Sequence, residues 1–215
     1  MYVSNTDKGK GIDMSDPKHQ RRKEARPEEI ITAALAEFGE KGFAGASMGS
    51  IATRAGIARP TVYLYYPDKS ALFDAAIQDR LGGMLARAQD ILTVDAPFPA
   101  LLERVLRNYY DRIVGTDAAV LIRVLIAEGG RFPAMAAFLR DNMLHSIETV
   151  LGQLVAKGIA RGEVRAEAQT MDLKVIMAPA VFSVVYGLIF GNLAPLDKER
   201  YIRSHLDLML RGLTP

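Results

Sequence analysis

An all-α fold is predicted from three features of this sequence. Apolar residues recur at helical spacing, proline and glycine divide the chain into helix-length segments, and no stretch alternates apolar and polar residues as a strand would. The expected architecture is a three-helix N-terminal domain followed by a larger helical domain. A chain of 215 residues with 49% hydrophobic residues is long enough to bury such a core.

The N-terminal segment is polar. Residues 1–22 have low hydrophobicity, so we expect a disordered tail, and they lack the apolar stretch of a signal peptide. The basic run over residues 19–26 is either a phosphate-contacting segment or a solvated leader. Pro27 is expected in the first turn of the first helix, which Lys41 and Gly42 then end.

Two short helices joined by a tight turn are predicted over residues 47–66. Ser47 suits the N-cap of the first, and Gly56 ends it. Its apolar face repeats at helical spacing on Met48, Ile51, Ala52 and Ala55. The second helix covers about residues 59–66, with Pro60 in its first turn. This pattern is typical of a helix-turn-helix, whose second helix lies in the DNA major groove.

The second helix is predicted to have a buried and an outward side, at 100° per residue. The buried side holds Ala58, Val62, Tyr65 and Tyr66. The outward side holds Pro60, Thr61, Tyr63 and Leu64 and has no acidic group, so it suits phosphate oxygens and thymine methyl groups. Residues 18–70 carry 9 basic and 6 acidic residues, whereas residues 71–215 carry 16 of each. The small positive excess therefore lies where DNA would bind.

Residues 26–72 resemble the DNA-binding domain of the TetR family. The matching positions are Phe38, Gly42-Phe43, Ser47, Ile51-Ala52, Ala55-Gly56-Ile57, Thr61-Val62-Tyr63, Tyr65-Tyr66, Lys69 and Leu72. Two positions depart from the usual pattern. Ala58 stands where the family often has a capping serine, and Leu64 stands where a histidine is frequent.

The resemblance implies a ligand-responsive, cytoplasmic transcriptional regulator that leaves its operator when a small, mostly apolar molecule binds. It implies a helix-turn-helix domain over residues 23–70 and a ligand-binding and dimerisation domain over residues 71–215. Ser47, Thr61, Tyr63 and Lys69 would contact DNA, with Lys69 on a phosphate. Arg54 and Arg59 are added from their charge and position, and Pro60 and Leu64 from the outward side.

The C-terminal part is expected to be helical over about residues 69–93, 98–114, 117–129, 133–160, 169–191 and 197–211. The helix that begins near Lys69 would transmit a ligand-induced tilt to the DNA-binding helices. The last two helices would form the homodimer, as the resemblance implies. Their charge-free run, residues 175–191, is shorter than a membrane span, which favours a buried helix.

Ligand contacts are expected from apolar and aromatic residues of the middle helices, although each such residue is more often part of a core. The candidates are Tyr109, Tyr110, Phe138, Met143, Met177, Phe182 and Tyr186. Arg123 is a further candidate, but pairing with Glu128 is the favoured interpretation.

The sequence does not indicate an enzyme or a cofactor. It has no cysteine, which fits a reducing cytoplasm, and its three histidines are far apart, so a metal site is not expected. No nucleophile elbow or phosphate-binding glycine loop is present. The alternatives are a helical small-molecule-binding or membrane-associated protein, in which the N-terminal motif only packs, and, last, an enzyme.

Overall fold

The computed structural model describes the backbone of residues 17–215 and the side chains from Arg26 onward. These residues form helices and no strands, so the predicted all-α fold is confirmed. The elements are α1 (Pro17–Gly45), α2 (Met48–Arg54), α3 (Arg59–Tyr65), α4 (Lys69–Thr93), α5 (Phe98–Ile113), α6 (Ala118–Glu128), α7 (Pro133–Leu139), the π-helical segment η1 (Arg140–Leu144), α8 (His145–Ala160), the 3₁₀ segment η2 (Ala166–Thr170), α9 (Lys174–Phe190) and α10 (Lys198–Leu213).

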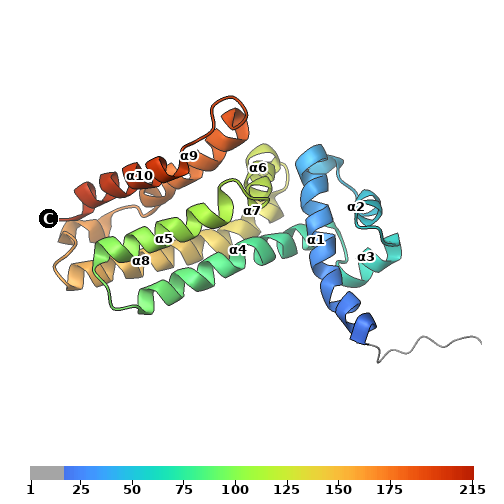
Figure 1. Cartoon of the computed structure of the whole chain (residues 1–215), viewed down its shortest axis with the longest axis horizontal. Helices are drawn as coiled ribbons and strands as arrows, with labels where there is room; N and C mark the ends of the chain where they lie inside the picture. Colours follow the sequence, from blue (N-terminus) through green and yellow to red (C-terminus); the bar gives the residue numbers. More distant parts are fainter. Residues whose placement is uncertain (1–16) are drawn as a thin grey trace, which may run out of the picture.

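The helices form two groups joined by α4 (Figure 1). Helices α1, α2 and α3 pack together at one end of the molecule. Helix α4 leaves this group and runs beside α5 and α8, and α9 and α10 cover another side of α5. Helices α6 and α7 lie between the two groups, and α6 packs against α1.

An aromatic cluster holds the N-terminal group to the start of α4. The rings of Phe38, Phe43 and Phe73 lie 5.5–5.6 Å apart, within the range of favourable edge and tilted contacts. Phe132, just before α7, packs on Phe43 at 4.9 Å, so the cluster also includes the larger group. Phe38 and Phe73 have no exposed surface, which marks them as central to this core.

Helix α1 begins earlier than expected. The predicted start at Pro27 is wrong, because the helix extends back to Pro17 and Pro27 lies inside it. Residues 17–22, expected in the tail, are therefore helical, and residues 1–16 of that tail lie outside the described part of the chain. The predicted end is confirmed at Gly42, whose φ of 71° is a left-handed value that favours glycine.

The helix expected over residues 133–160 is interrupted by η1, in which the backbone widens to the π-helical pattern. The helix expected from residue 169 begins only at Lys174, after the 3₁₀ segment η2. Within the described residues, no helix is long and apolar enough to cross a membrane.

Candidate DNA-binding surface and effector cavity

The helix-turn-helix is built by local capping. Ser47 is the N-cap of α2, as predicted, and its hydroxyl accepts a hydrogen bond from the Ser50 amide at 3.1 Å. The Ser50 hydroxyl in turn accepts one from the Ser47 amide at 3.1 Å, which completes a capping box. Helix α3 has no side-chain cap, and Pro60 in its first turn presets the helical φ instead.

The outer side of α3 is exposed. Leu64 is 83% exposed and Tyr63 is 41% exposed. Val62, on the side of α3 that faces the core, is fully buried. The Arg59 guanidinium donates a hydrogen bond to the Tyr63 hydroxyl at 3.2 Å and lies 5.6 Å from the ring centre. These side chains, with exposed Pro60, form a surface that carries one positive charge and no acid.

Two residues depart from their predicted sides. Ala58 is exposed rather than buried, because it is the extended N-cap residue of α3 and does not follow the helical angle. Thr61, expected on the outward side, is half-buried. The tyrosines Tyr65 and Tyr66 are also half-buried, at the edge of the expected core face.

Arg54 and Lys69, both expected to contact DNA, have partners within the chain. Arg54 bonds the carboxylates of Glu37, at 3.0 Å, and Glu40. The Lys69 ammonium donates hydrogen bonds to the carbonyls of Phe43, at 2.5 Å, and Ala46, at 2.8 Å. These hydrogen bonds join the start of α4 to the link between α1 and α2, and the phosphate contact of Lys69 stays a prediction. Burial lowers the pKa of Lys69 below its usual range.

Helix α6, which belongs to the larger group, also bonds the backbone at the end of α1. The Glu128 carboxylate accepts hydrogen bonds from the amides of Phe43, at 2.6 Å, and Ala44, at 2.8 Å. The Arg123 guanidinium donates to the Gly39 carbonyl. The expected Arg123–Glu128 pair does not form, because each side chain bonds the α1 backbone instead. Sequence reasoning noticed both charges on an apolar helix but lacked the long-range contact that explains them.

A cavity of about 680 Å³ lies in the larger group, within the range of small-molecule sites. Its wall is mostly apolar and comes from α4, α5, α6, α7, η1, α8 and α9 and from Leu173, just before α9. The lining residues are Leu81, Tyr109, Ile113, Ile122, Leu125, Ile126, Leu139, Met143, Leu144, Ile147, Glu148, Leu151, Leu173, Lys174, Met177, Ala178, Val181, Phe182 and Val185. The π-helical segment η1 contributes Met143 and Leu144, as π-bulges often do at functional sites.

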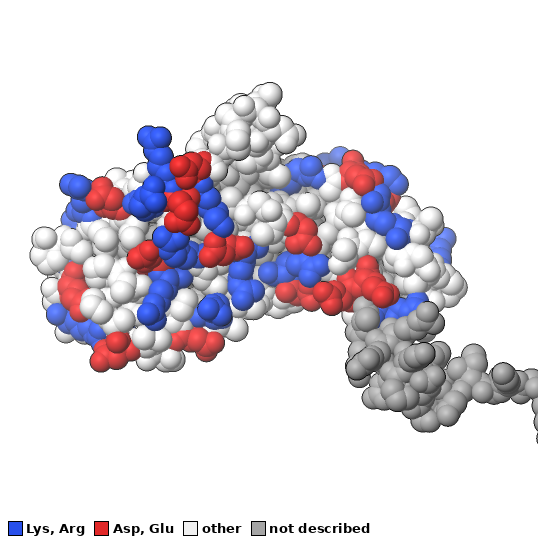
Figure 2. Space-filling view, in the orientation of Figure 1, with Lys and Arg blue, Asp and Glu red and all other residues white. Residues whose placement is uncertain are grey.

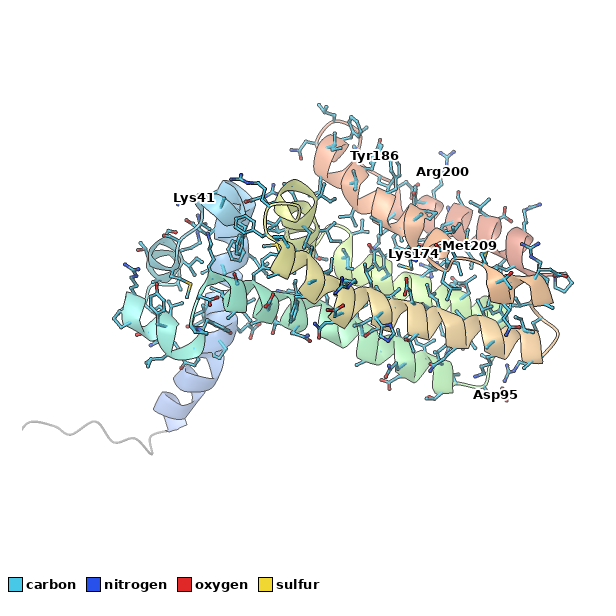
Figure 3. The ribbon with its side chains drawn as sticks, turned by 180° about the vertical axis from the view of Figure 1, so that it is seen from behind. Lys41, Asp95, Lys174, Tyr186, Arg200 and Met209 are labelled. Atoms are coloured by element: carbon cyan, nitrogen blue, oxygen red, sulfur yellow. The ribbon has the colours of Figure 1, made fainter. Side chains whose placement is uncertain are left out.

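Four of the eight residues that the sequence offered as ligand contacts lie in the cavity wall. Tyr109, Met143, Met177 and Phe182 line it. Arg123, Phe138 and Tyr186 do not, because Arg123 bonds α1, Phe138 packs at the core edge, and Tyr186 lies between the rings of Phe182 and Phe190. Figure 3 shows Tyr186 near the outer end of α9. Tyr110 instead packs fully buried between α5 and α10.

Most of the cavity wall consists of aliphatic side chains that were not predicted from the sequence. Isoleucine and leucine at helical spacing indicate a buried face but not whether a neighbouring helix fills the space in front of it. The charged lining residues are Glu148 and Lys174, whose side chains lie 3.3 Å apart at the start of α9. The described residues contain no group of three side chains suited to hold a metal ion.

Two family models match the chain. The model of "Bacterial regulatory proteins, tetR family" matches residues 30–76, and that of the "Tetracyclin repressor-like, C-terminal domain" matches residues 100–208, about half of the chain. The regulator RutR of Escherichia coli is 32% identical over 185 residues, which cover 86% of this chain and 72% of RutR. The chain belongs to the TetR family.

Other relatives match over most of the chain. The fatty acid metabolism regulator protein of Bacillus subtilis is 22% identical over 193 residues, 89% of this chain and 98% of the relative. The structure of FadR from Bacillus subtilis in complex with stearoyl-CoA has a TM-score of 0.71 at 19% identity, covering 86% of this chain and 98% of that one. This likeness shows that the two chains share their fold over most of their lengths.

The predicted family is thus confirmed, and with it the general function. As a member of the TetR family, the protein is a transcriptional regulator with a helix-turn-helix, not an enzyme. The alternative in which the N-terminal motif only packs is not supported.

Proposed function

We propose that the protein is a repressor that binds operator DNA through α3 and is released when a small, mostly apolar molecule enters the cavity. Residues 23–70 form the DNA-binding domain in this proposal, and residues 71–215 the effector and dimerisation domain. The observation that carries the DNA contact is the acid-free, exposed face of α3, seated on a buried Val62. Such a helix is suited to the major groove.

The contacts divide by chemistry. Arg59 and Tyr63 are proposed to bond phosphates, together with the exposed Ser47 hydroxyl at the start of α2. Leu64 and Pro60 present apolar surface to base edges, where the thymine methyl group is the matching feature. Thr61 is half-buried and contributes its hydroxyl at the margin of this face.

A homodimer is proposed through α9 and α10. The outer end of α9 and the loop after it carry no charged residue and project from the body, as the white tip in Figure 2 shows. Ile189 is 61% exposed there and Leu193 84%, an apolar patch of the kind that marks a protein interface. A two-fold dimer would place two copies of α3 on half-sites ~34 Å apart.

Helix α6 provides a physical route from the cavity to α3. Ile122, Leu125 and Ile126 line the cavity, and Arg123 and Glu128 of the same helix bond the backbone at the end of α1. A molecule that displaces α6 would therefore shift α1, α2 and α3 together. We propose this route beside the expected tilt of α4, with a coupling free energy of about 1–3 kcal/mol.

The DNA contact is tested by selecting bound duplexes from a random pool and measuring affinity by gel shift at several salt concentrations. We expect salt-sensitive binding, with each phosphate contact adding about 0.9 to the slope. Tyr63→Ala combined with Arg59→Ala should abolish specific binding, while Arg87→Ala, an exposed arginine on α4 far from α3 in sequence, serves as the matched control. Unchanged binding in the double variant would disprove the assigned face.

The effector part is tested with Nile red, an uncharged lipophilic dye. We expect the dye to bind the wild-type protein and release the selected DNA. Ala178→Trp places an indole in the cavity wall and should prevent both effects while leaving DNA binding intact. Release of DNA from this variant at the wild-type dye concentration would contradict the proposed site.

A further inference from the structure

The cavity contains one buried polar group without a partner. Tyr109 of α5 lines the wall and is 5% exposed. Its hydroxyl is the buried side-chain polar atom that has no hydrogen-bond partner among the described residues. Because buried hydroxyls in proteins are almost always bonded, an unpaired one in a cavity wall indicates that the bound molecule supplies the partner.

The protonation state of this hydroxyl decides which partner fits. Burial raises the pKa of Tyr109 well above its usual value, so the phenol keeps its proton at neutral pH. Its unmet requirement is therefore an acceptor for the O–H group. A carbonyl oxygen satisfies that requirement without bringing a charge into the apolar wall.

The charges at the cavity argue against an anionic molecule. Lys174 is the cationic lining residue, and its ammonium lies 3.3 Å from the Glu148 carboxylate and 3.2 Å from that of Asp172. These three groups sum to one negative charge. Lys174 lies at the start of α9 (Figure 3), where its side chain is 66% exposed. A carboxylate or phosphate buried here would lack a free cation to offset its lost hydration.

We propose that the cavity binds an uncharged lipophilic molecule with one accepting oxygen, such as a ketone or ester carbonyl, bonded to the Tyr109 hydroxyl. This inference rests on the proposed effector role of the cavity and names the chemical class of its ligand. It distinguishes this protein from a receptor for free acids or for acyl thioesters of coenzyme A.

The test measures binding of methyl laurate, lauric acid and lauroyl-CoA to the full chain by equilibrium dialysis. We expect methyl laurate to bind about tenfold or more tightly than either anionic probe. Tyr109→Phe removes the hydroxyl and keeps the ring, and should weaken ester binding about five- to tenfold, as loss of one hydrogen bond does. Tyr186→Phe, the same change at a tyrosine outside the lining, should leave it unchanged.

Three results would overturn the inference: tighter binding of the acid or the thioester, no binding of the ester, or unchanged ester affinity in Tyr109→Phe. If Tyr109→Phe fails to fold, Lys174→Gln decides, because an anion-binding site would lose affinity for lauric acid and ours would keep its affinity for the ester. Gel shifts on the same preparations separate the two proposals. Intact DNA binding with failed ester binding removes only this inference, whereas lost DNA recognition removes the proposed function.

Discussion

Glu37 is the carboxylate most deeply buried among the described residues, at 1% exposure. It bonds Lys41 at 2.5 Å on its own helix and Arg54 at 3.0 Å on α2. The hydrogen bond from Lys41, with smaller contributions from Ser50 and Arg54, lowers the pKa of Glu37 to about 2. This carboxylate therefore fixes the angle between α1 and α2, on which the position of α3 depends.

Glu37→Gln should destabilise the protein by about 3 kcal/mol at pH 7, since it removes the charge that its two cations share. Because the folded pKa lies below the unfolded one of 4.5, the stability that Glu37 adds is present at neutral pH and is lost as the pH falls from 4.5 towards 2. Urea unfolding at pH 7 and pH 3 measures this. The exposed neighbour Glu40→Gln is the control and should change stability by less than about 1 kcal/mol.

At the residue scale, local roles were predictable and distant partners were not. Ser47 was identified as an N-cap because its partner lies three residues away. The charges of Lys69 and Arg54 were visible in the sequence and their DNA contacts stay predictions, whereas their acceptors within the chain, on α1 and its link many residues earlier, were not foreseen. Charge in a sequence identifies a donor, but only the fold decides which acceptor it meets.

At the scale of elements, His205 joins three helices. Its Nε2 lies 3.0 Å from the Ile176 carbonyl on α9, and its Nδ1 lies 3.0 Å from the Tyr110 hydroxyl on α5. A carbonyl only accepts, so Nε2 carries the proton and Nδ1 accepts from Tyr110. The neutral imidazole is thus fully bonded in a site between α5, α9 and α10.

Burial lowers the pKa of His205 below 6.5, which makes its contribution pH-dependent. Well above pH 6.5 the imidazole is neutral in the folded and the unfolded protein. As the pH falls below 6.5, the unfolded chain takes up the proton before the folded protein does, so the free energy of unfolding decreases. We expect wild type to lose more stability between pH 7.5 and pH 5.5 than His205→Gln, which does not titrate. Thermal melts at both pH values would contradict this if the two proteins lost equal stability.

Element positions were largely predictable because apolar spacing is a local property. Helix α4 covers residues 69–93 as expected. The π-helical η1 was not predicted, since helical spacing in the sequence does not separate a π-helical turn from an α-helical one. The start of α1 was predicted wrongly because proline is common in the first turn of helices. No local pattern before Pro27 showed that the helix begins earlier.

At the scale of the whole molecule, the charge-free end of α9 is apolar surface that a single copy of the chain leaves exposed to solvent. Phe190, Ile189 and Leu193 are exposed there. The sequence run over residues 175–191 was expected to be buried, and the described chain buries only part of it, including Ile176 and Val184. The remaining surface is consistent with the proposed second copy.

Ile189→Glu should therefore convert a dimer to a monomer in analytical ultracentrifugation. It should also weaken operator binding about a hundredfold or more, because the two DNA contacts would no longer be linked. Val94→Glu, a comparable change at an exposed valine after α4, is the control. A dimeric Ile189→Glu protein with wild-type affinity would exclude this face as the interface.

The division of labour along α6 bears on how such a protein could acquire a new inducer. Ile122, Leu125 and Ile126 line the cavity, whereas Arg123 and Glu128 form hydrogen bonds with the backbone of α1. Libraries that randomise the three aliphatic positions while retaining the two charged ones should yield biosensors with altered chemical preference and preserved signalling. Natural selection could likewise change which molecule the cavity recognises without altering the contacts of Arg123 and Glu128 with α1.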